Sequence, residues 1–169
     1  MANRATIGDM SPDDRDDIHL RRAIELAAQA RARGDHPFGS LLVAPDGGVV
    51  AEGMNSVDTA GDPTGHAETN VVRAVGHLDL ATRAELTLYT STEPCAMCSG
   101  AIYWAGIGTV VYALGEDDLR EMAGDDPANP TLAMPCRRIF DAGSRPIVVR
   151  GPVALDAARE VHAGFWQHG

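Results

Sequence analysis

Basic side chains are scarce in this chain, which has 14 lysine and arginine residues against 24 acidic ones and a net charge of −10. Cationic contacts with phosphates dominate nucleic-acid affinity, so this balance argues against a nucleic-acid partner, although it leaves room for a local basic groove. No apolar run approaches the roughly 20 residues that a membrane span requires. No apolar stretch of signal-peptide length follows residues 1–4. We therefore expect a cytoplasmic protein with no membrane partner.

Cysteine and aromatic residues are also few. Three cysteines, two of them spaced Cys-x-x-Cys, do not make the disulfide framework of a small secreted domain. Hydrophobic residues make up 44% of the chain, enough to bury a sizeable core in one domain. The sequence contains neither an internal repeat nor a linker. We expect a mobile leader over residues 1–10 and a single domain over residues 11–169.

Helix and strand signals alternate along the chain. Ser11 as cap, Pro12 at the first helical position and two following acids predict a helix start, and Gly34 predicts its end. Strands are predicted over residues 40–44, 49–54, 86–90, 109–113 and 146–149. Further helices are predicted over residues 66–75 and 95–105, around Ile139 and Phe140, and over residues 154–166. Residues 55–65 are loop-like, and residues 115–135 are predicted to be irregular with one short helix. Strands separated by helices predict an α/β fold with a mixed sheet.

Two short motifs carry the chemistry. His66-Ala67-Glu68 is followed by Pro94-Cys95-Ala96-Met97-Cys98, and both lie where helices are predicted to begin. Two thiolates and one imidazole favour Zn²⁺, and three protein ligands leave a fourth position for water, as in catalytic sites. Glu68 is the spare acid, placed to move protons for that water. The chemistry that this set supports is hydrolytic deamination of a heteroaromatic ring.

Two other interpretations of the motifs stay open. A redox Cys-x-x-Cys would form a reversible disulfide and bind no metal. A non-catalytic module could use the same three ligands as a structural zinc clip, but such a site has no use for Glu68.

Around the motifs the sequence resembles the zinc-dependent cytidine and purine deaminase superfamily, which carries His-x-Glu followed by Pro-Cys-x-x-Cys. The resemblance covers roughly residues 15–142. It is carried by His36-Pro37-Phe38-Gly39, Ala51-Glu52-Gly53-Met54-Asn55, and the stretches 62–68 and 88–98. Residues 100–105 are most similar to bacterial guanine deaminases and related nucleobase deaminases. The resemblance implies a three-layer α/β/α fold, with a central mixed sheet of about five strands flanked by helices.

The resemblance implies an aminohydrolase, with guanine as the best single guess for the substrate and xanthine and ammonia as products. Another ring stays open as the substrate: an s-triazine such as ammeline, cytosine, or a nucleoside, since the sequence does not show the size of the pocket. A tRNA adenosine deaminase shares the core motif, but the net negative charge argues against it.

The resemblance also implies which residues surround the Zn²⁺ ligands His66, Cys95 and Cys98. It assigns Asn55 to a hydrogen bond with the ring, although an asparagine after a strand is also a common turn residue. Phe38 and Trp104 could sandwich a flat heterocycle, or belong to the core. Ala67 and Trp166 complete the implied substrate contacts.

The remaining assignments concern the last third of the chain and the other histidines. Asp126 lies where guanine deaminases have a catalytic acid, although an Asp pair before Pro127 is also typical of an exposed turn. Phe165-Trp166 could pack on its own domain or reach a partner's site, and the resemblance implies a homodimer, with exchanged C-terminal segments as one arrangement. Cys136 is expected to be a small buried residue and not a fourth ligand. The remaining histidines make no second metal site by their spacing: His19, His36, His77, His162 and His168.

Overall fold

The computed structural model describes residues 10–124 and 130–166. Five strands form one mixed sheet in the order β2-β1-β3-β4-β5. Strands β1 (Gly39–Val43), β2 (Val49–Met54) and β3 (Thr87–Thr92) pair antiparallel, with β1 between the other two. Strands β4 (Thr109–Leu114) and β5 (Val148–Arg150) continue the sheet in parallel with β3. The α/β architecture and the mixed five-stranded sheet predicted from the sequence are confirmed.

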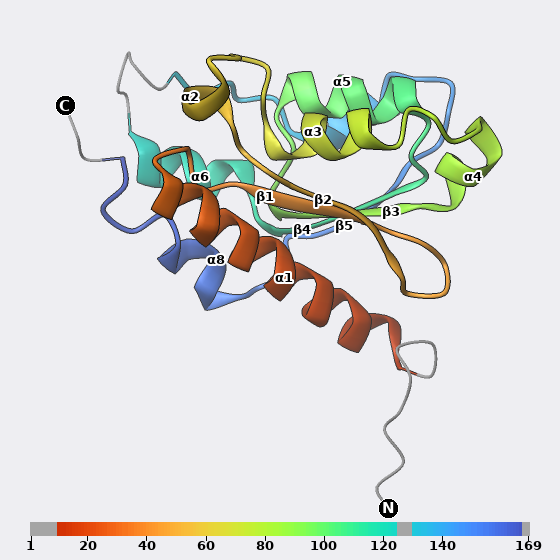
Figure 1. Ribbon diagram of the computed structural model, residues 1–169, viewed down its shortest axis with the longest axis horizontal. Coiled ribbons are helices and arrows are strands. Elements are labelled where there is room, and N and C mark those ends of the chain that lie inside the picture. The colour runs from red at the N-terminus through yellow and green to blue at the C-terminus, as the bar shows by residue number, and fades with distance from the viewer. Residues whose placement is uncertain (1–9, 125–129, 167–169) are drawn as a thin grey trace, which may run out of the picture.

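Helices cover both faces of this sheet, which gives three layers (Figure 1). Helix α1 (Pro12–Arg33) packs on β1, β3 and β4, beside α8 (Asp156–Glu160). Helix α3 (Ala67–Ala74) lies on the opposite face against β1 and β2, and it contacts α5 (Ala96–Ala105). Helix α7 (Cys136–Asp141) packs against α5. Helix α6 (Glu116–Ala123) follows β4 directly.

The two cores follow from the alternation of side chains along buried strands. Leu41 and Val111 point toward α1, whereas their neighbours Leu42 and Val110 point toward α3 and α5. All four side chains are fully buried. Because successive residues of a strand face opposite sides, a strand covered on both faces can be apolar at every position, as over residues 41–43 and 110–114.

The first helix begins and ends as predicted. The Ser11 side chain accepts a hydrogen bond from the backbone N–H of Asp14, and Gly34 ends the helix with a left-handed φ of 98°. Two short helices occur where the sequence predicted none: α2 (Val57–Ala60) and α4 (Leu80–Glu85). Both are too short for an apolar periodicity to indicate them.

The C-terminal helix is shorter than predicted. It ends at Glu160, not at residue 166, and the chain continues in turns with a left-handed φ of 69° at Gly164. Arg31 of α1 donates hydrogen bonds to the carbonyl oxygens of Val161 at 2.7 Å and Ala163 at 2.9 Å. These contacts satisfy carbonyls that a continuing helix would have used, and they turn the chain back toward the sheet.

Among residues 10–124 and 130–166, no helix combines the length and the apolar character needed to cross a membrane. The predicted leader falls almost entirely on residues 1–9, which lie outside the described residues.

Candidate active site

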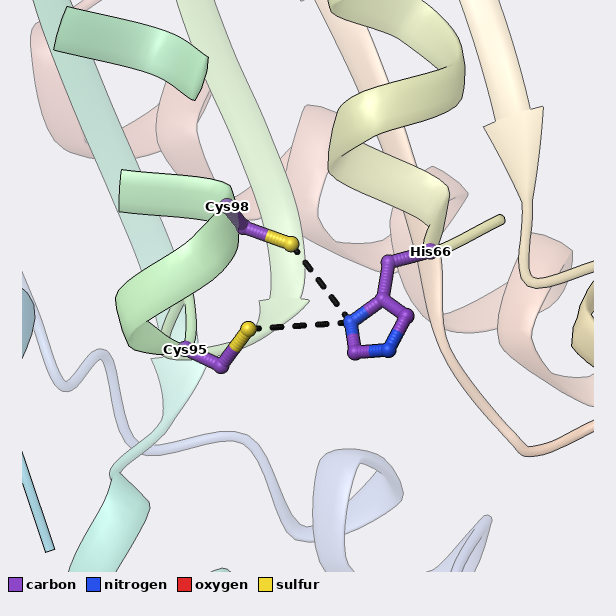
Figure 2. A group of neighbouring side chains, drawn as sticks. All are labelled: His66, Cys95 and Cys98. Atoms are coloured by element: carbon purple, nitrogen blue, oxygen red, sulfur yellow. Dashed lines mark hydrogen bonds between the residues drawn. The ribbon is translucent and has the colours of Figure 1, made fainter. Parts of the chain in front are cut away.

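Three potential metal ligands converge where two helices begin (Figure 2). His66 is the N-cap of α3, Cys95 is the N-cap of α5, and Cys98 lies in the first turn of α5. The Nδ1 atom of His66 lies 3.6 Å from the Sγ of Cys95 and 3.5 Å from that of Cys98. All three ligand atoms lie within 4.8 Å of one another. This set of one imidazole and two sulfurs fits Zn²⁺ with one coordination position left for a fourth ligand.

The surroundings of the two cysteines shift the pKa values of their thiols in opposite directions. A hydrogen bond from Cys98, followed by one from His66, lowers the pKa of Cys95 to about 4. The same hydrogen bond to Cys95, together with burial, raises the pKa of Cys98 well above its ordinary value. Binding of a cation by both sulfurs would favour their thiolate forms and release protons that they hold.

Glu68 lies against these ligands from the first turn of α3. Its side chain is 5% exposed, and its Oε2 accepts a hydrogen bond from the Cys98 thiol at 3.5 Å. Its Oε1 accepts a hydrogen bond from the hydroxyl of Thr90 at 2.8 Å. Burial raises the pKa of the Glu68 carboxyl. The sequence-based expectation of an acid beside the ligands therefore matches the geometry.

A largely apolar cavity of about 520 Å³ opens over His66 and Cys95. One wall comes from the loop before α3 and the start of α5, a second from α6 and the segment after residue 129, and a third from the C-terminal turn. The lining residues are His36, Phe38, Val57, Pro63, Ala96, Met97, Glu116, Leu119, Ala123, Pro130, Thr131, Leu132 and Trp166. Such an enclosure suits a small, flat, largely apolar ligand.

Phe38 and Trp166 are brought together at this cavity. Their ring centroids lie 6.0 Å apart at 46°, and Trp166 also stacks on His162 at 5.8 Å. Arg31 lies over the ring of Phe165 at 5.8 Å and so adds a cation–π contact to its hold on the C-terminal turn. Trp166 thus lines the cavity of its own chain.

Asn55 and Ala67 are fully buried, and neither is among the residues that line the cavity. The Oδ1 of Asn55 accepts a hydrogen bond from the N–H of Val57 at 3.1 Å. Its Nδ2 is buried and has no hydrogen-bond partner in the part of the chain that the structure describes. Ala67 is the first residue of α3, between His66 and Glu68, with no exposed surface.

Trp104 does not line this cavity. Trp104 is 81% exposed on α5 and packs edge-on against Tyr103, outside the cavity lining. Asp126 lies outside the described residues. Cys136 is fully buried in the core beside Phe140, as expected for a residue that is not a ligand. Within the described ranges, the three-residue cluster at His66 is the group placed to hold a metal.

Two acids of the site were not singled out from the sequence. Glu93 immediately precedes Pro94-Cys95 and is 9% exposed, and Glu116 follows β4 and lines the cavity. The signal that could have found them is their place directly after adjacent parallel strands, because ligands bind at the carboxyl ends of such strands.

The model of the cytidine and deoxycytidylate deaminase zinc-binding region matches residues 13–114. The chain therefore belongs to the zinc-dependent cytidine and deoxycytidylate deaminase family. This membership agrees with the ligand geometry and identifies the chain as an enzyme of the deaminase class that acts with zinc.

Individual relatives carry different substrate names. A probable cytosine deaminase of Schizosaccharomyces pombe is 45% identical over 159 residues, which cover 92% of this chain and 95% of the relative. The guanine deaminase of Bacillus subtilis is 45% identical over 109 residues, covering 63% of this chain and 69% of the relative. The solved guanine deaminase of Nitrosomonas europaea superposes with a TM-score of 0.69 at 26% identity, over 96% of this chain and 98% of that structure. These similarities support deamination of a nucleobase.

Proposed function

We propose that this chain removes the amino group of a free nucleobase by hydrolysis, with guanine as the leading substrate. The observation that carries the proposal is the buried carboxyl of Glu68, which lies against Cys98 beside the open cavity. A structural zinc clip would not need an acid in this position. The apolar cavity over the ligands has room for a flat ring.

The residues divide the reaction between them. His66, Cys95 and Cys98 would hold Zn²⁺, which when bound would lower the pKa of a water molecule. Glu68 takes a proton from the attacking water and delivers it to a ring nitrogen. The water oxygen bonds to the ring carbon that carries the amino group. Glu68 then moves the remaining proton of that oxygen to the amino group as the carbon–nitrogen bond breaks, so that the ring gains a carbonyl and ammonia leaves. The raised pKa of Glu68 suits a group that must hold a proton between transfers.

We infer that three side chains hold the ring. The Nδ2 of Asn55 donates no hydrogen bond to any described group, so it can donate one to an acceptor on the ring. Phe38 and Trp166 provide flat apolar walls, against which a heterocycle can stack. Both walls belong to one chain.

Cytosine is the second candidate. It is favoured by the Schizosaccharomyces pombe relative, which matches 92% of this chain, whereas guanine is favoured by the Bacillus subtilis and Nitrosomonas europaea relatives. Adenosine in tRNA is less favoured, because the net charge of −10 opposes a phosphate-rich partner.

Ammonia release from a panel of rings tests the proposal. Zinc-loaded protein is incubated with guanine, cytosine, adenine, ammeline, guanosine and cytidine, and we expect the highest kcat/KM for guanine. Glu68→Gln should retain zinc and fold but lose at least about 100-fold in kcat, because general acid–base catalysis contributes about 10²- to 10⁴-fold. The exposed control Glu85→Gln should leave kcat unchanged. Absence of ammonia from every ring would reject the proposal, and faster turnover of cytosine would replace guanine by cytosine.

We also propose that α5 pairs two copies of the chain. Met97 and Trp104 lie two turns apart on one face of this helix, and they are 38% and 81% exposed. Burial of a tryptophan of this exposure would favour association. Sedimentation should find a dimer for the wild type and a monomer for Trp104→Ala, whereas identical masses would reject this interface.

A further inference from the structure

Glu116 is an acid in the cavity that the proposed reaction does not use. It is the first residue of α6, one residue beyond the end of β4, and it is 9% exposed. It lines the same cavity as the ligands His66 and Cys95, and most of its neighbours there, such as Leu119 and Leu132, are apolar. A carboxyl in such surroundings has lost much of its hydration, so a hydrogen-bond donor that enters the cavity would stabilise it.

The position of Glu116 is fixed relative to the zinc ligands. The Oε2 of Glu93 accepts a hydrogen bond from the backbone N–H of Glu116 at 3.0 Å. Glu93 is separated from Cys95 by one residue, and its Oε1 accepts a second hydrogen bond, from the N–H of Cys136 at 2.9 Å. Hydrogen bonds to a buried carboxylate are strong, so the start of α6 is held to the same strand end that presents Cys95. The carboxyl of Glu116 therefore belongs to a preorganised wall of the site.

The electrostatic surroundings of Glu116 make an entering donor favourable. Burial, and next the charge of Glu93, raise its pKa to about 7. Arg120 opposes this shift from one turn along α6, but its guanidinium also pairs with Asp117 at 3.3 Å. A ring N–H that donates a hydrogen bond to Glu116 would stabilise its carboxylate, which burial and the charge of Glu93 disfavour.

We propose that Glu116 is a substrate-binding residue, whose carboxylate accepts hydrogen bonds from ring N–H groups on an edge other than the one that carries the leaving amine. This inference rests on the proposed function and narrows its substrate class to heterocycles with such donors. A ring that presents only acceptors or methyl groups at this edge would leave the carboxylate unpaired, so it would bind more weakly.

The test is a double-perturbation cycle. It compares how Glu116→Gln changes the binding of a parent base and of its N-methylated analogues. Guanine, 1-methylguanine, 9-methylguanine, cytosine and 1-methylcytosine are titrated calorimetrically into zinc-loaded Glu68→Gln protein, with and without Glu116→Gln. The wild-type and Glu116→Gln proteins are assayed for kcat and KM in parallel. The parent base should bind about 10- to 100-fold more weakly to the Glu116→Gln protein, the loss expected for a hydrogen bond to a charged group. The analogue that lacks the recognised N–H should lose less than about threefold.

Matched variants separate substrate contact from folding. Asp117→Asn removes an adjacent acid whose side chain is 87% exposed, and it should change neither binding nor zinc content. If Glu116→Gln folds poorly, Glu116→Asp replaces it: the charge remains but the carboxyl withdraws by one methylene, so a substrate contact still predicts weaker binding.

Each result has one meaning. If the wild type releases ammonia while Glu116→Gln binds the parent base equally well, the inference is wrong and the proposed function stands. Equal losses for the parent base and for every methylated analogue would also overturn it, since they would indicate a general change in the cavity. If wild-type protein neither binds nor deaminates any base, the proposed function and the inference fail together.

Discussion

Strand β1 has no room for a side chain at Gly39, where it packs against α1, so Gly39→Ala is a severe test of the packing. A Cβ atom at Gly39 would lie 2.5 Å from the backbone nitrogen of Ala27 and 2.6 Å from the Cβ of Leu26, and it would also overlap the carbonyl oxygen of Ala23. Two of these neighbours are backbone atoms of α1, so no side-chain rotation can relieve the clash. The helix must therefore withdraw from β1 by roughly 1 Å to restore ordinary contact distances.

The cost of this withdrawal follows from the core that α1 covers. A gap of 0.5–1 Å loses about a quarter to a half of the dispersion energy of each contact. Leu20, Ile24 and Leu41 are buried in this core and would all lose contacts. Overpacking typically costs about 1–3 kcal/mol, and a backbone clash places Gly39→Ala at the upper end, about 3 kcal/mol. For a chain of this length that is a fall in Tm of about 6–12 °C.

Urea and thermal unfolding followed by circular dichroism measure this effect. The matched control is Gly76→Ala, because a Cβ at Gly76 meets only the carbonyl oxygen of Arg73, at an acceptable 3.4 Å. It should change the free energy of unfolding by no more than about 0.5 kcal/mol. A loss below about 1 kcal/mol for Gly39→Ala, or equal losses for the two variants, would show that α1 does not sit on β1 as described.

Other perturbations give further expected outcomes. Asp16→Asn should lower the unfolding free energy by about 2 kcal/mol in urea, because Asp16 accepts hydrogen bonds from Tyr89 at 2.8 Å and from half-exposed Arg150 at 2.7 Å. Asp17→Asn, in an exposed pair, should cost no more than about 0.5 kcal/mol, and equal costs would contradict the role of burial. Burial lowers the pKa of His162 to about 4, below the unfolded value of 6.5, so stability should fall by up to about 3 kcal/mol as the pH drops from 6.5 to 4. That slope should shrink in His162→Gln, and an unchanged slope would mean that other groups cause it. Zinc at 1,000 times its Kd should add about 4 kcal/mol to the free energy of unfolding, so a chelator should lower Tm, and added zinc should restore it. A Tm that does not change with the chelator would contradict zinc binding to the folded protein.

Local signals in the sequence predicted much of the fold. The cap at Ser11, the left-handed Gly34 and the turn between β1 and β2 act over a few residues, so their effects are readable in order along the chain. The site ligands were equally readable, because a helix begins at each of the two motifs and brings its first residues to one edge of the sheet.

What the sequence did not predict depends on contacts between distant segments. The end of α8 at Glu160 is set by Arg31, which lies about 130 residues earlier in the chain. The meeting of Glu93 and Glu116 depends on the parallel pairing of Thr92 with Leu114, which aligns the ends of β3 and β4. Neither contact leaves a pattern in the local sequence, so both become visible only in the folded structure.

The carboxylate of Glu93 has a consequence for how such a site can change in evolution. It holds the N–H groups of Glu116 and Cys136, which are the two ends of the segment that supplies one wall of the cavity. With both ends fixed by a single side chain, the length and composition of the segment can vary at little cost, because the entropy of closing a loop rises slowly with its length. Helices α3 and α5, which carry the zinc ligands, need not move when this happens. Substrate choice is thereby separable from the chemistry, a separation that fits a family in which relatives of one zinc-binding region are named for cytosine and for guanine.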